Sequence, residues 1–312
     1  MKTEKRARVS PMPKSVIAKF VAHHPVALHL GAHKTATTFV QAQLDAARHT
    51  LSGNNVALLV PRDIRAKSDP VLSRAPAHVR FEAAVNASLE TKTPKRLIMS
   101  EEGIIGSPRQ NLTQGELYRD LRARLSSLPK ALNHANVTIF FAVRDYGPCF
   151  SSCVTTALRS GHRFDHLELR RRLLIMARGW ADVIADIRAT FPKAKLCVWR
   201  YEAFEHVQSE VLARMAGQRI AANQPRVFET LTQRTVETAM PLLAEKMSVK
   251  LRRELFREAV RAYPLGPDNP RFSLWSEEEA RLLNERYEMD WATILRRFAD
   301  SVLISQACPP NR

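Results

Sequence analysis

Cysteine is scarce in this chain. Its 312 residues include four cysteines, Cys149, Cys153, Cys197 and Cys308, and no two of them have the Cys-x-x-Cys spacing of a zinc or redox site. Four cysteines in so long a chain do not build a disulfide framework, which excludes a small disulfide-stabilised secreted domain. We expect a reduced intracellular setting, no metal site, and Cys149 and Cys153 buried on one face of a helix.

Long apolar runs are also missing. No run approaches the ~20 residues that span a bilayer, so we expect no membrane span. The segment 1–24 begins with basic residues, but its apolar part, Val16 to Ala22, is short and interrupted by Lys19, which makes it a poor signal peptide. We therefore expect a cytoplasmic protein with a basic N-terminal tail over 1–24, mobile up to about Lys14, and a single domain over 25–312.

Acidic residues are outnumbered: 31 Asp and Glu face 48 Lys and Arg, a net charge of +17. Such a charge attracts nucleic acid, anionic membranes and phosphorylated small molecules. Aromatic residues make up only 7% of the chain, and no nucleic-acid-binding motif is present. A basic protein that binds nucleic acid or another polyanion without catalysis is therefore an alternative rather than the leading interpretation, and no specific nucleic-acid partner is expected.

Five short apolar runs predict strands, at residues 26–30, 56–60, 97–100, 137–143 and 195–200. They are apolar on both faces, as in a parallel sheet covered on both sides, and stretches of helical period separate them. The clearest predicted helix spans 166–190, with apolar residues at steps of three and four: Leu173, Ala177, Trp180, Ile184 and Ile187. This alternation predicts an α/β fold with an open, mostly parallel sheet flanked by helices.

The chain after Glu202 is expected to be mostly helical, with a proline-rich break at 263–270. Ser276, followed three residues later by Glu279, is a capping-box signature for the last helix. An apolar stripe follows it: Leu283, Tyr287, Trp291, Leu295 and Phe298. We interpret this stripe as core packing.

The first candidate site is the segment "HLGAHKTATTFVQ", residues 29–41, between the first predicted strand and a segment of helical period. Free amides at a helix start and the positive end of the helix dipole attract anions, and this loop adds the ammonium of Lys34. Three hydroxyls lie beside it, those of Thr35, Thr37 and Thr38. The segment therefore predicts a P-loop-like, phosphate-binding loop.

A nucleotide-binding P-loop, G-x-x-x-x-G-K-[ST], carries glycine immediately before its lysine, where this chain has His33. The nearby glycine is Gly31, and no convincing Walker-B strand ending in aspartate follows. A kinase of the P-loop type is therefore the weaker enzyme interpretation.

The second candidate site is "FFAVRDYGPCFSSC", in which the strand 137–143 ends at Arg144 and Asp145, and Ser152 follows eight residues after Arg144. A guanidinium offers a planar fork of donors to phosphate, and Ser152 in the following helix can reach the same oxygens. A salt bridge from Arg144 to Asp145, or to another neighbour at a strand end, is the alternative explanation of this arginine.

Together the two segments resemble sulfotransferases, in particular the bacterial sulfotransferase-like proteins. Their loop reads close to L-H-I-G-x-H-K-T-G-T-T, and a later strand ends in Val-Arg-Asp-Pro with a serine eight residues after the arginine. This chain differs by Ala36 in place of glycine, which costs roughly 1 kcal/mol if φ is positive, and by Tyr146 in place of proline. Weaker similarity, in "KLCVWRYEAF" and "FSLWSEEEARLLNERYEMDW", extends the resemblance over most of residues 25–295.

The resemblance implies 3′-phosphoadenosine 5′-phosphosulfate as co-substrate, with no metal. It implies that the 5′-phosphosulfate is bound by the loop residues His33, Lys34, Thr35, Ala36, Thr37 and Thr38. It implies that Arg144 and Ser152 bind the 3′-phosphate. A third contact to that phosphate has only loose candidates, Arg219, Arg226 and Arg234.

Sulfuryl transfer also needs stabilisation of the leaving group, for which Lys34 is placed, and a base for the acceptor. "LIMSEEGIIG" puts Glu101 and Glu102 at a strand end, where adjacent side chains point to opposite faces and at most one reaches the pocket. We expect Glu101 to be the base, with Glu102 in reserve and His33 as a further candidate. Alternatively, Glu101 caps the next helix or pairs with a basic neighbour.

The acceptor is expected to carry a hydroxyl or amine, on a small molecule or a glycan. His162, with Arg159 and Arg163, is a candidate for lining its pocket, and the basic surface favours an anionic or polyol acceptor. Pockets of this kind are built from variable loops, so the sequence does not identify the acceptor. An inactive relative that keeps the fold is a further possibility, and nothing in the sequence indicates an oligomeric state.

Overall fold

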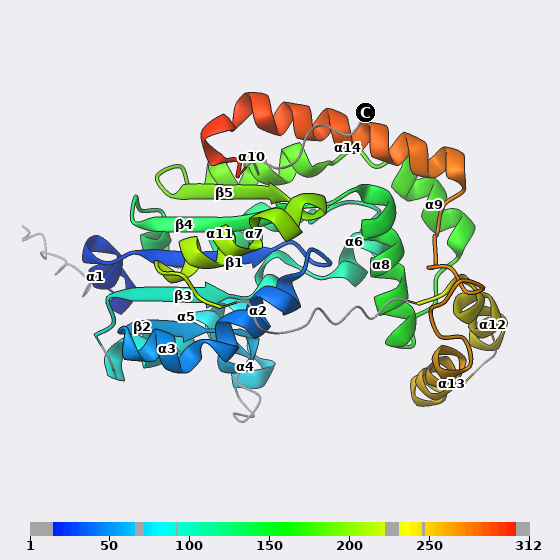
Figure 1. Ribbon diagram of the computed structural model, residues 1–312, viewed down its shortest axis with the longest axis horizontal. Helices are drawn as coiled ribbons and strands as arrows, with labels where there is room; N and C mark the ends of the chain where they lie inside the picture. Colours follow the sequence, from blue (N-terminus) through cyan, green and yellow to red (C-terminus); the bar gives the residue numbers. More distant parts are fainter. Residues whose placement is uncertain (1–14, 66–71, 92, 222–230, 245–246, 304–312) are drawn as a thin grey trace, which may run out of the picture.

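The computed structural model describes residues 15–65, 72–91, 93–221, 231–244 and 247–303. Its centre is a five-stranded sheet with the order β2-β3-β1-β4-β5, and every neighbouring pair of strands is parallel (Figure 1). The strands are β1 (Val26–Gly31), β2 (Val56–Leu59), β3 (Arg96–Ser100), β4 (Val137–Val143) and β5 (Lys195–Arg200). Each begins and ends within one residue of its predicted bounds, so the predicted α/β fold with a parallel sheet is confirmed.

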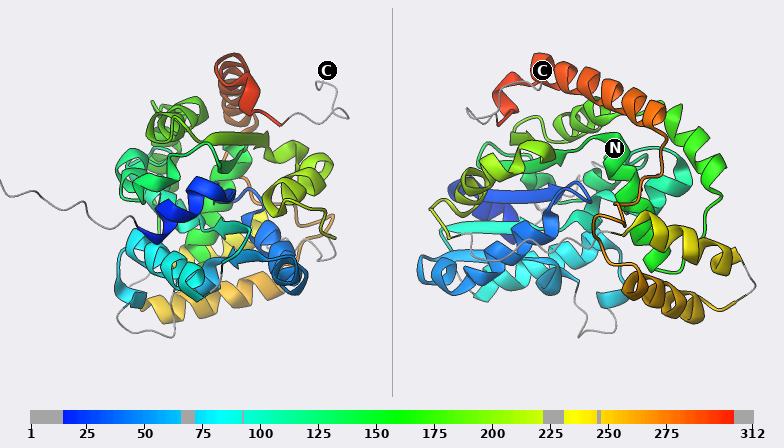
Figure 2. Two further views of the ribbon diagram at one scale, coloured as in Figure 1. Left: turned by 90° about the vertical axis from the view of Figure 1, so that its left-hand side faces the viewer. Right: turned by 45° about the vertical axis from the view of Figure 1, so that its right-hand side comes forward.

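Helices cover both faces of the sheet (Figure 2). One face packs against α2 (Thr37–Ala46), α3 (Arg48–Gly53) and α11 (Phe204–Ala216), through strand residues such as Ile98 and Phe140. The opposite face belongs to a larger core, to which Met99 and Phe141, one position further along their strands, contribute. This alternation along strands that are apolar throughout is what a parallel sheet buried on both sides requires.

The larger core also buries the first helix of the chain, together with helices that follow β2, β3 and β4. The helices on this side include α1 (Val16–His23), α5 (Ala77–Thr91), α7 (Leu121–Ser126) and α10 (Trp180–Thr190). Ile17, Phe20 and Val21 of α1 are buried, so part of the segment assigned to the N-terminal tail belongs to the folded unit. Residues 1–14 of that tail lie outside the described residues.

The remaining helices gather beyond the carboxyl ends of the strands and along the β5 side of the sheet (Figure 1). They are α4 (Pro61–Ile64), α6 (Pro108–Gln114), α8 (Tyr146–Arg159), α9 (His166–Leu174), α12 (Gln233–Ala244), α13 (Val249–Ala262) and α14 (Glu277–Arg297). The short 3₁₀ helix η2 (Glu102–Ile105) follows β3. The mostly helical character expected after Glu202 is confirmed for the described residues.

The predicted capping box begins α14. Ser276 accepts from the amide of Glu279 at 3.3 Å, and the amide of Ser276 donates to Glu279 Oε2 at 2.9 Å. Leu283 and Tyr287 of the predicted stripe are fully buried. Near the far end of the stripe, the predicted core residue Leu295 is only half-buried. Its neighbour Ile294, which was not predicted, is buried in the core instead.

The predicted helix 166–190 is wrong as a single element, because the chain breaks between α9 and α10. The amide of Trp180, the first residue of α10, donates to Tyr146 Oη and to Asp290 Oδ2, both at 2.7 Å. A Cβ on Gly179 would collide with Asp290 Oδ2, so this glycine lets α14 approach the break closely. Ala177, counted as a core position in the prediction, is exposed.

Within the described part of the chain, none of the helices has the length and apolarity that crossing a bilayer demands.

The Tyr146 hydroxyl holds α8, α10 and α14 together, because it also hydrogen-bonds to Asp290. We expect Tyr146→Phe to lower the free energy of unfolding by about 1–3 kcal/mol, since it removes a buried hydroxyl and leaves Asp290 with one partner fewer. Urea denaturation measures this change. Tyr263→Phe is the matched control, as no hydrogen bond of the Tyr263 hydroxyl is found among the described residues. Equal stability of the two variants would contradict the prediction.

Candidate functional site

The loop between β1 and α2 has an unusual backbone for a segment with few glycines. Lys34 has φ 65° and Ala36, the residue that caps α2, has φ 64°, so both are left-handed. Among the described residues, no acceptor is found for the backbone amides of residues 34–38. Successive unpaired amides with left-handed residues among them are typical of anion-binding turns, which makes this loop the candidate anion site.

Gly31 ends β1 and is required there for two reasons. Its φ of 101° is one that side-chain-bearing residues rarely adopt. A Cβ at this position would lie 3.2 Å from Glu102 Cβ and 3.2 Å from Thr37 Cγ2. The loop therefore begins in close contact with η2, and Glu102 lies beside it.

Lys34 points from the loop towards α8, where its Nζ donates to Thr156 Oγ1 at 2.9 Å. In the described portion of the chain, no carboxylate forms an ion pair with it. Burial lowers the pKa of Lys34, and the charges of Arg144 and Arg159 lower it further. The cation thus lies among other cations, with a neutral hydroxyl as its hydrogen-bond partner.

Arg144 lies at the end of β4 and joins the two predicted site segments. Its Nη1 donates to the carbonyl of Lys34 at 2.5 Å, and its guanidinium stacks over the ring of Tyr201 at 4.3 Å. Its Nε is buried without a partner, and no described carboxylate pairs with it. Asp145 instead caps α8 by accepting from the amide of Gly147 at 3.0 Å, so the alternative of an Arg144–Asp145 salt bridge is wrong.

Ser152 is half-buried on α8, one turn before Thr156. Positions four apart share a helix face, so Ser152 and the Lys34 partner lie on the same side of α8. The Ser152 hydroxyl makes no hydrogen bond to another described residue. It is therefore available to a ligand.

The two acids after β3 have different surroundings. Glu101 is buried and receives two hydrogen bonds from Arg65, each 2.9 Å long, and one from the amide of Gly103 at 2.8 Å. It therefore both caps η2 and pairs with a basic neighbour. Glu102 accepts from Gln41 at 2.6 Å and from Arg65 at 3.1 Å.

Opposing effects set the pKa of Glu102. Burial acts to raise it, but a backbone hydrogen bond, the Gln41 amide and the charges of His33 and Arg65 outweigh burial and lower it. Glu102 is therefore ionised at neutral pH. It is the acid that lies against Gly31 at the start of the loop.

His33 is held by Tyr118. Its amide donates to Tyr118 Oη at 3.0 Å, and its Nδ1 lies 3.1 Å from the same oxygen. Burial lowers the pKa of His33 to about 4, an effect that Glu102 opposes and that Lys34 and Arg65 reinforce. The imidazole is therefore neutral at neutral pH.

The three threonines of the loop differ in what they do. Thr35 is buried and its hydroxyl donates to the carbonyl of Ala32 at 2.6 Å, which closes the loop on itself. Thr37 is buried and Thr38 is exposed. No hydrogen bond of either hydroxyl is found within the described residues.

A buried polar network beneath the loop was missed by the sequence analysis. His29 Nδ1 lies 2.8 Å from Ser100 Oγ, which also accepts from Gln41 at 3.3 Å. Burial lowers the pKa of His29 to about 4, despite the opposing charge of Glu102. A histidine inside an otherwise apolar strand was the signal that could have pointed to this network.

Other predicted residues lie away from the loop. Arg219 lies near the amino-terminal end of β2, whereas the loop follows the carboxyl end of β1. The residue before it, Gln218, accepts a hydrogen bond from Asn54, just before β2. Arg234 on α12 stacks over Tyr263 at 4.9 Å. His162 lies beyond the far end of α8, and Arg226 lies outside the described residues.

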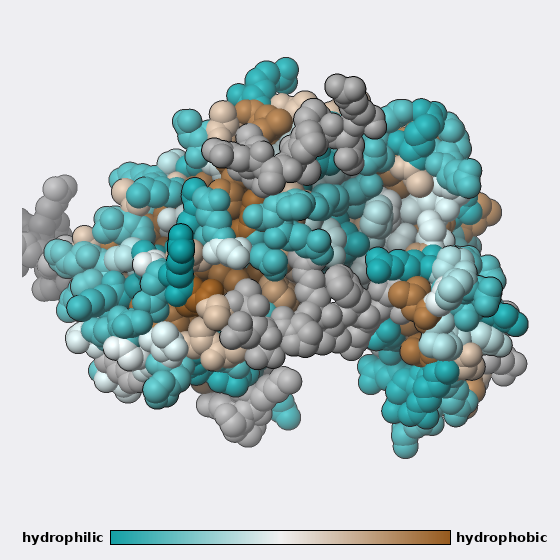
Figure 3. Space-filling view, in the orientation of Figure 1, coloured by the Kyte–Doolittle hydropathy of each residue, from teal (hydrophilic) through white to brown (hydrophobic). Residues whose placement is uncertain are grey.

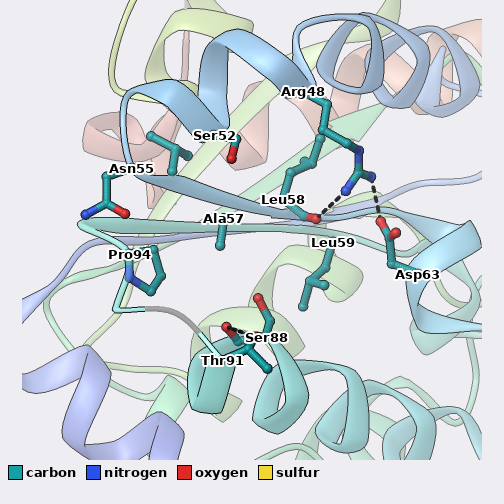
Figure 4. A pocket seen from close by; sticks show the side chains of 11 residues that line it. Arg48, Ser52, Asn55, Ala57, Leu58, Leu59, Asp63, Ser88, Thr91 and Pro94 are labelled. Atoms are coloured by element: carbon teal, nitrogen blue, oxygen red, sulfur yellow. Dashed lines mark hydrogen bonds and ion pairs between the residues drawn. The ribbon is translucent and has the colours of Figure 1, made fainter.

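A cavity of about 300 Å³ opens at the free side of β2, between α3 and α5 (Figure 4). Arg48, one of its lining residues, pairs with Asp63 at 2.7 Å and donates to the carbonyl of Leu58 at 3.1 Å. None of the predicted site residues lines it. The candidate site is therefore the polar surface around the loop and not this cavity.

Within the described residues, no group of three or more His, Cys, Asp or Glu side chains is arranged to hold a metal ion. Cys149 and Cys153 are buried on α8, as expected for core residues, and Cys308 lies outside the described residues.

No protein-family model matches this chain, and no match was found among curated proteins. The site is therefore interpreted from its own geometry.

The left-handed conformation of Ala36 predicts that glycine is the better residue at this position. We expect Ala36→Gly to raise the free energy of unfolding by up to about 1 kcal/mol, since glycine adopts this φ without steric cost. Chemical denaturation provides the measurement. Ala42→Gly, on the exposed side of α2, is the matched control and should destabilise by about 0.5–1 kcal/mol. The same sign for both variants would contradict the left-handed assignment.

His29 predicts a pH dependence of stability. Its pKa is 6.5 when unfolded and about 4 when folded, so the unfolded chain binds more protons between these values. The free energy of unfolding should fall as the pH decreases from about 6.5 to 4, by up to roughly 3 kcal/mol from this residue. Denaturation across this range should show a smaller loss in His29→Gln than in the wild type. The exposed His206→Gln is the control; an unchanged slope in His29→Gln would refute the assignment.

Proposed function

We propose that this protein is a sulfotransferase that transfers a sulfuryl group from 3′-phosphoadenosine 5′-phosphosulfate to a hydroxyl or amine. The observation that carries the proposal is the pairing of Lys34 and Arg144: two cations in contact through one loop, neither with a carboxylate partner among the described residues. Burying cations without counter-charges is costly, so such a cluster favours a function that supplies anions.

Two separate anionic groups fit the arrangement better than one. The loop amides of residues 34–38 and the Lys34 ammonium form one set of donors, suited to the 5′-phosphosulfate. The guanidinium of Arg144, whose buried Nε has no partner, and the half-buried Ser152 hydroxyl would supply a second set, suited to the 3′-phosphate. A nucleotide with phosphates at both ends of its ribose would satisfy both sets. This agrees with the resemblance of the two sequence segments to sulfotransferases.

The chemistry follows from these donors. The acceptor oxygen or nitrogen forms a bond to sulfur while the bond from sulfur to the 5′-phosphate oxygen breaks, and that oxygen takes the electron pair. Lys34 exchanges its hydrogen bond to Thr156 for one to this oxygen and stabilises the developing charge. Positioning and electrostatics supply the catalysis, as in phosphoryl transfer, and the proposed reaction uses no metal.

The acceptor proton needs a base, and the surroundings of the two acids favour Glu102 over Glu101. Both Glu101 oxygens are occupied by Arg65 and by the η2 cap. Glu102 is ionised and lies against the first residue of the loop. His33 is neutral but has a pKa of about 4, which makes it a weak base. We therefore assign proton removal to Glu102, with Gln41 and Arg65 positioning its carboxylate.

The sulfotransferase proposal predicts binding of adenosine 3′,5′-bisphosphate, the product nucleotide. We expect it to raise the melting temperature, and to bind at least about tenfold more weakly to Lys34→Ala and Arg144→Ala, because each variant removes a cation that faces a phosphate. Thermal shift and calorimetric titration measure both effects. Lys195→Ala and Arg219→Ala are matched controls. They remove exposed charges near the amino-terminal ends of the strands, away from the loop.

Two outcomes would overturn the proposal. Stabilisation by ATP with Mg²⁺ and not by the bisphosphate would favour a P-loop-type kinase. Salt-sensitive binding of DNA with no effect of the bisphosphate would favour a non-catalytic nucleic-acid-binding protein.

A further inference from the structure

A cluster of basic side chains lies where α6, α8 and α13 meet, at the carboxyl-terminal end of α8. It consists of Arg109 on α6, His162 just after α8, and Arg252 and Arg253 on α13. Burial lowers the pKa of His162, and the charges of the three arginines lower it further. α13 packs closely against the end of α8, since a Cβ on Gly161 would lie 3.1 Å from Val249 Cγ1 and 3.5 Å from Arg253 Cγ. The four basic side chains at this junction are hereafter called the α8-end cluster.

Helix capping explains one member of the cluster. Arg253 Nε donates to the carbonyl of Ser160 at 3.1 Å, at the negative end of the α8 dipole. The other two arginines have no such role: Arg109 is exposed, and Arg252 is half-buried with its Nε buried and unpartnered. Across the described ranges, no carboxylate forms an ion pair with Arg109, Arg252 or Arg253.

The cluster begins one helical turn of α8 beyond the residue that binds Lys34. Thr156, which holds Lys34, and Ser160, which holds Arg253, are four residues apart on the same face of α8. Their carbonyls are separated by about 6 Å along the helix axis. A ligand that reaches Lys34 is therefore about one helical turn from the contact between α8 and α13.

We propose that the α8-end cluster binds the acceptor, and that this acceptor is an acidic saccharide with a carboxylate, sulfate or phosphate group near the hydroxyl that is modified. This inference rests on the proposed sulfotransferase function. Arg109 and Arg252 supply the charge, and His162 supplies a neutral hydrogen-bonding group beside them.

Two features favour a saccharide over other anions. None of the exposed large apolar side chains in the described residues is aromatic, so a stacking platform for nucleic-acid bases is lacking. The apolar side of α13 is already used inside the protein, since Phe256 and Ala259 are buried. Its outer surface is mostly hydrophilic (Figure 3), and its exposed large apolar side chains are Val249 and Leu251 in the first turn. A helix that inserts into a membrane would instead present a continuous apolar face.

The test is calorimetric titration of a heparin-derived hexasaccharide into the full chain saturated with adenosine 3′,5′-bisphosphate. We expect the double variant Arg109→Gln and Arg252→Gln to bind it at least about tenfold more weakly than the wild type, with unchanged nucleotide affinity. Arg253 is left in place because it caps α8. The matched control is Arg257→Gln with Arg261→Gln, which removes the same charge from exposed positions of α13 and should change binding by less than about threefold.

Three results would overturn the inference: wild-type affinity in the cluster variant, equal loss in the control variant, or tighter binding to single-stranded oligothymidylate or phosphatidylglycerol vesicles than to the hexasaccharide. The nucleotide titration separates this failure from that of the proposed function. If the bisphosphate binds and the hexasaccharide does not, the acceptor inference alone is wrong. If the bisphosphate does not bind, the sulfotransferase proposal is wrong, whatever the saccharide does.

Discussion

The hydrogen bond from Arg144 to the carbonyl of Lys34 joins the two parts of the candidate site. It fixes the end of β4 to the loop after β1, two strands that are neighbours in the sheet but far apart in the sequence. Tyr201, from the end of β5, stacks on the same guanidinium, and the Arg144 carbonyl accepts from Trp180 Nε1 at 2.7 Å. The position of Arg144 thus depends on the ends of β1, β4 and β5 and on α10. The loop after β1 depends in turn on Arg144.

The loop holds its shape with few glycines because its neighbours fix it. Left-handed Lys34 and Ala36 cost free energy that the Arg144 contact and the Thr35 and Tyr118 hydrogen bonds offset. Tyr146 stands where the Val-Arg-Asp-Pro pattern of sulfotransferases has proline, and this difference also has a structural explanation. The tyrosine begins α8 and links it to α10 and α14 through its hydroxyl. Both departures are therefore compatible with a well-formed site.

The strands could be predicted from the sequence because a parallel sheet demands continuous apolar runs, which are short and easily bounded here. The position of the loop between β1 and α2 followed from the same pattern, whereas the order of the strands in the sheet was not predicted. The break at Gly179 could not be predicted, since the partner of the Trp180 amide is Asp290, more than a hundred residues away. The burial of α1 was missed because its apolar residues are few, although Ile17, Phe20 and Val21 all face the core.

The site followed from the sequence only in part. The cations and hydroxyls were identified by residue type and spacing, whereas their partners depend on tertiary contacts. Glu101 was preferred over Glu102 on strand direction alone; its pairing with Arg65 involves an arginine that no motif marked. The His29, Ser100 and Gln41 network was missed for the same reason.

A crystal structure of the protein with adenosine 3′,5′-bisphosphate would show whether the loop and Arg144 hold the two phosphates. We expect the 5′-phosphate on the amides of residues 34–38, with Lys34 Nζ moved from Thr156 to a phosphate oxygen, and the 3′-phosphate on Arg144 and Ser152. A nucleotide bound elsewhere, or a 5′-phosphate that leaves the loop amides unpaired and Lys34 on Thr156, would contradict this expectation.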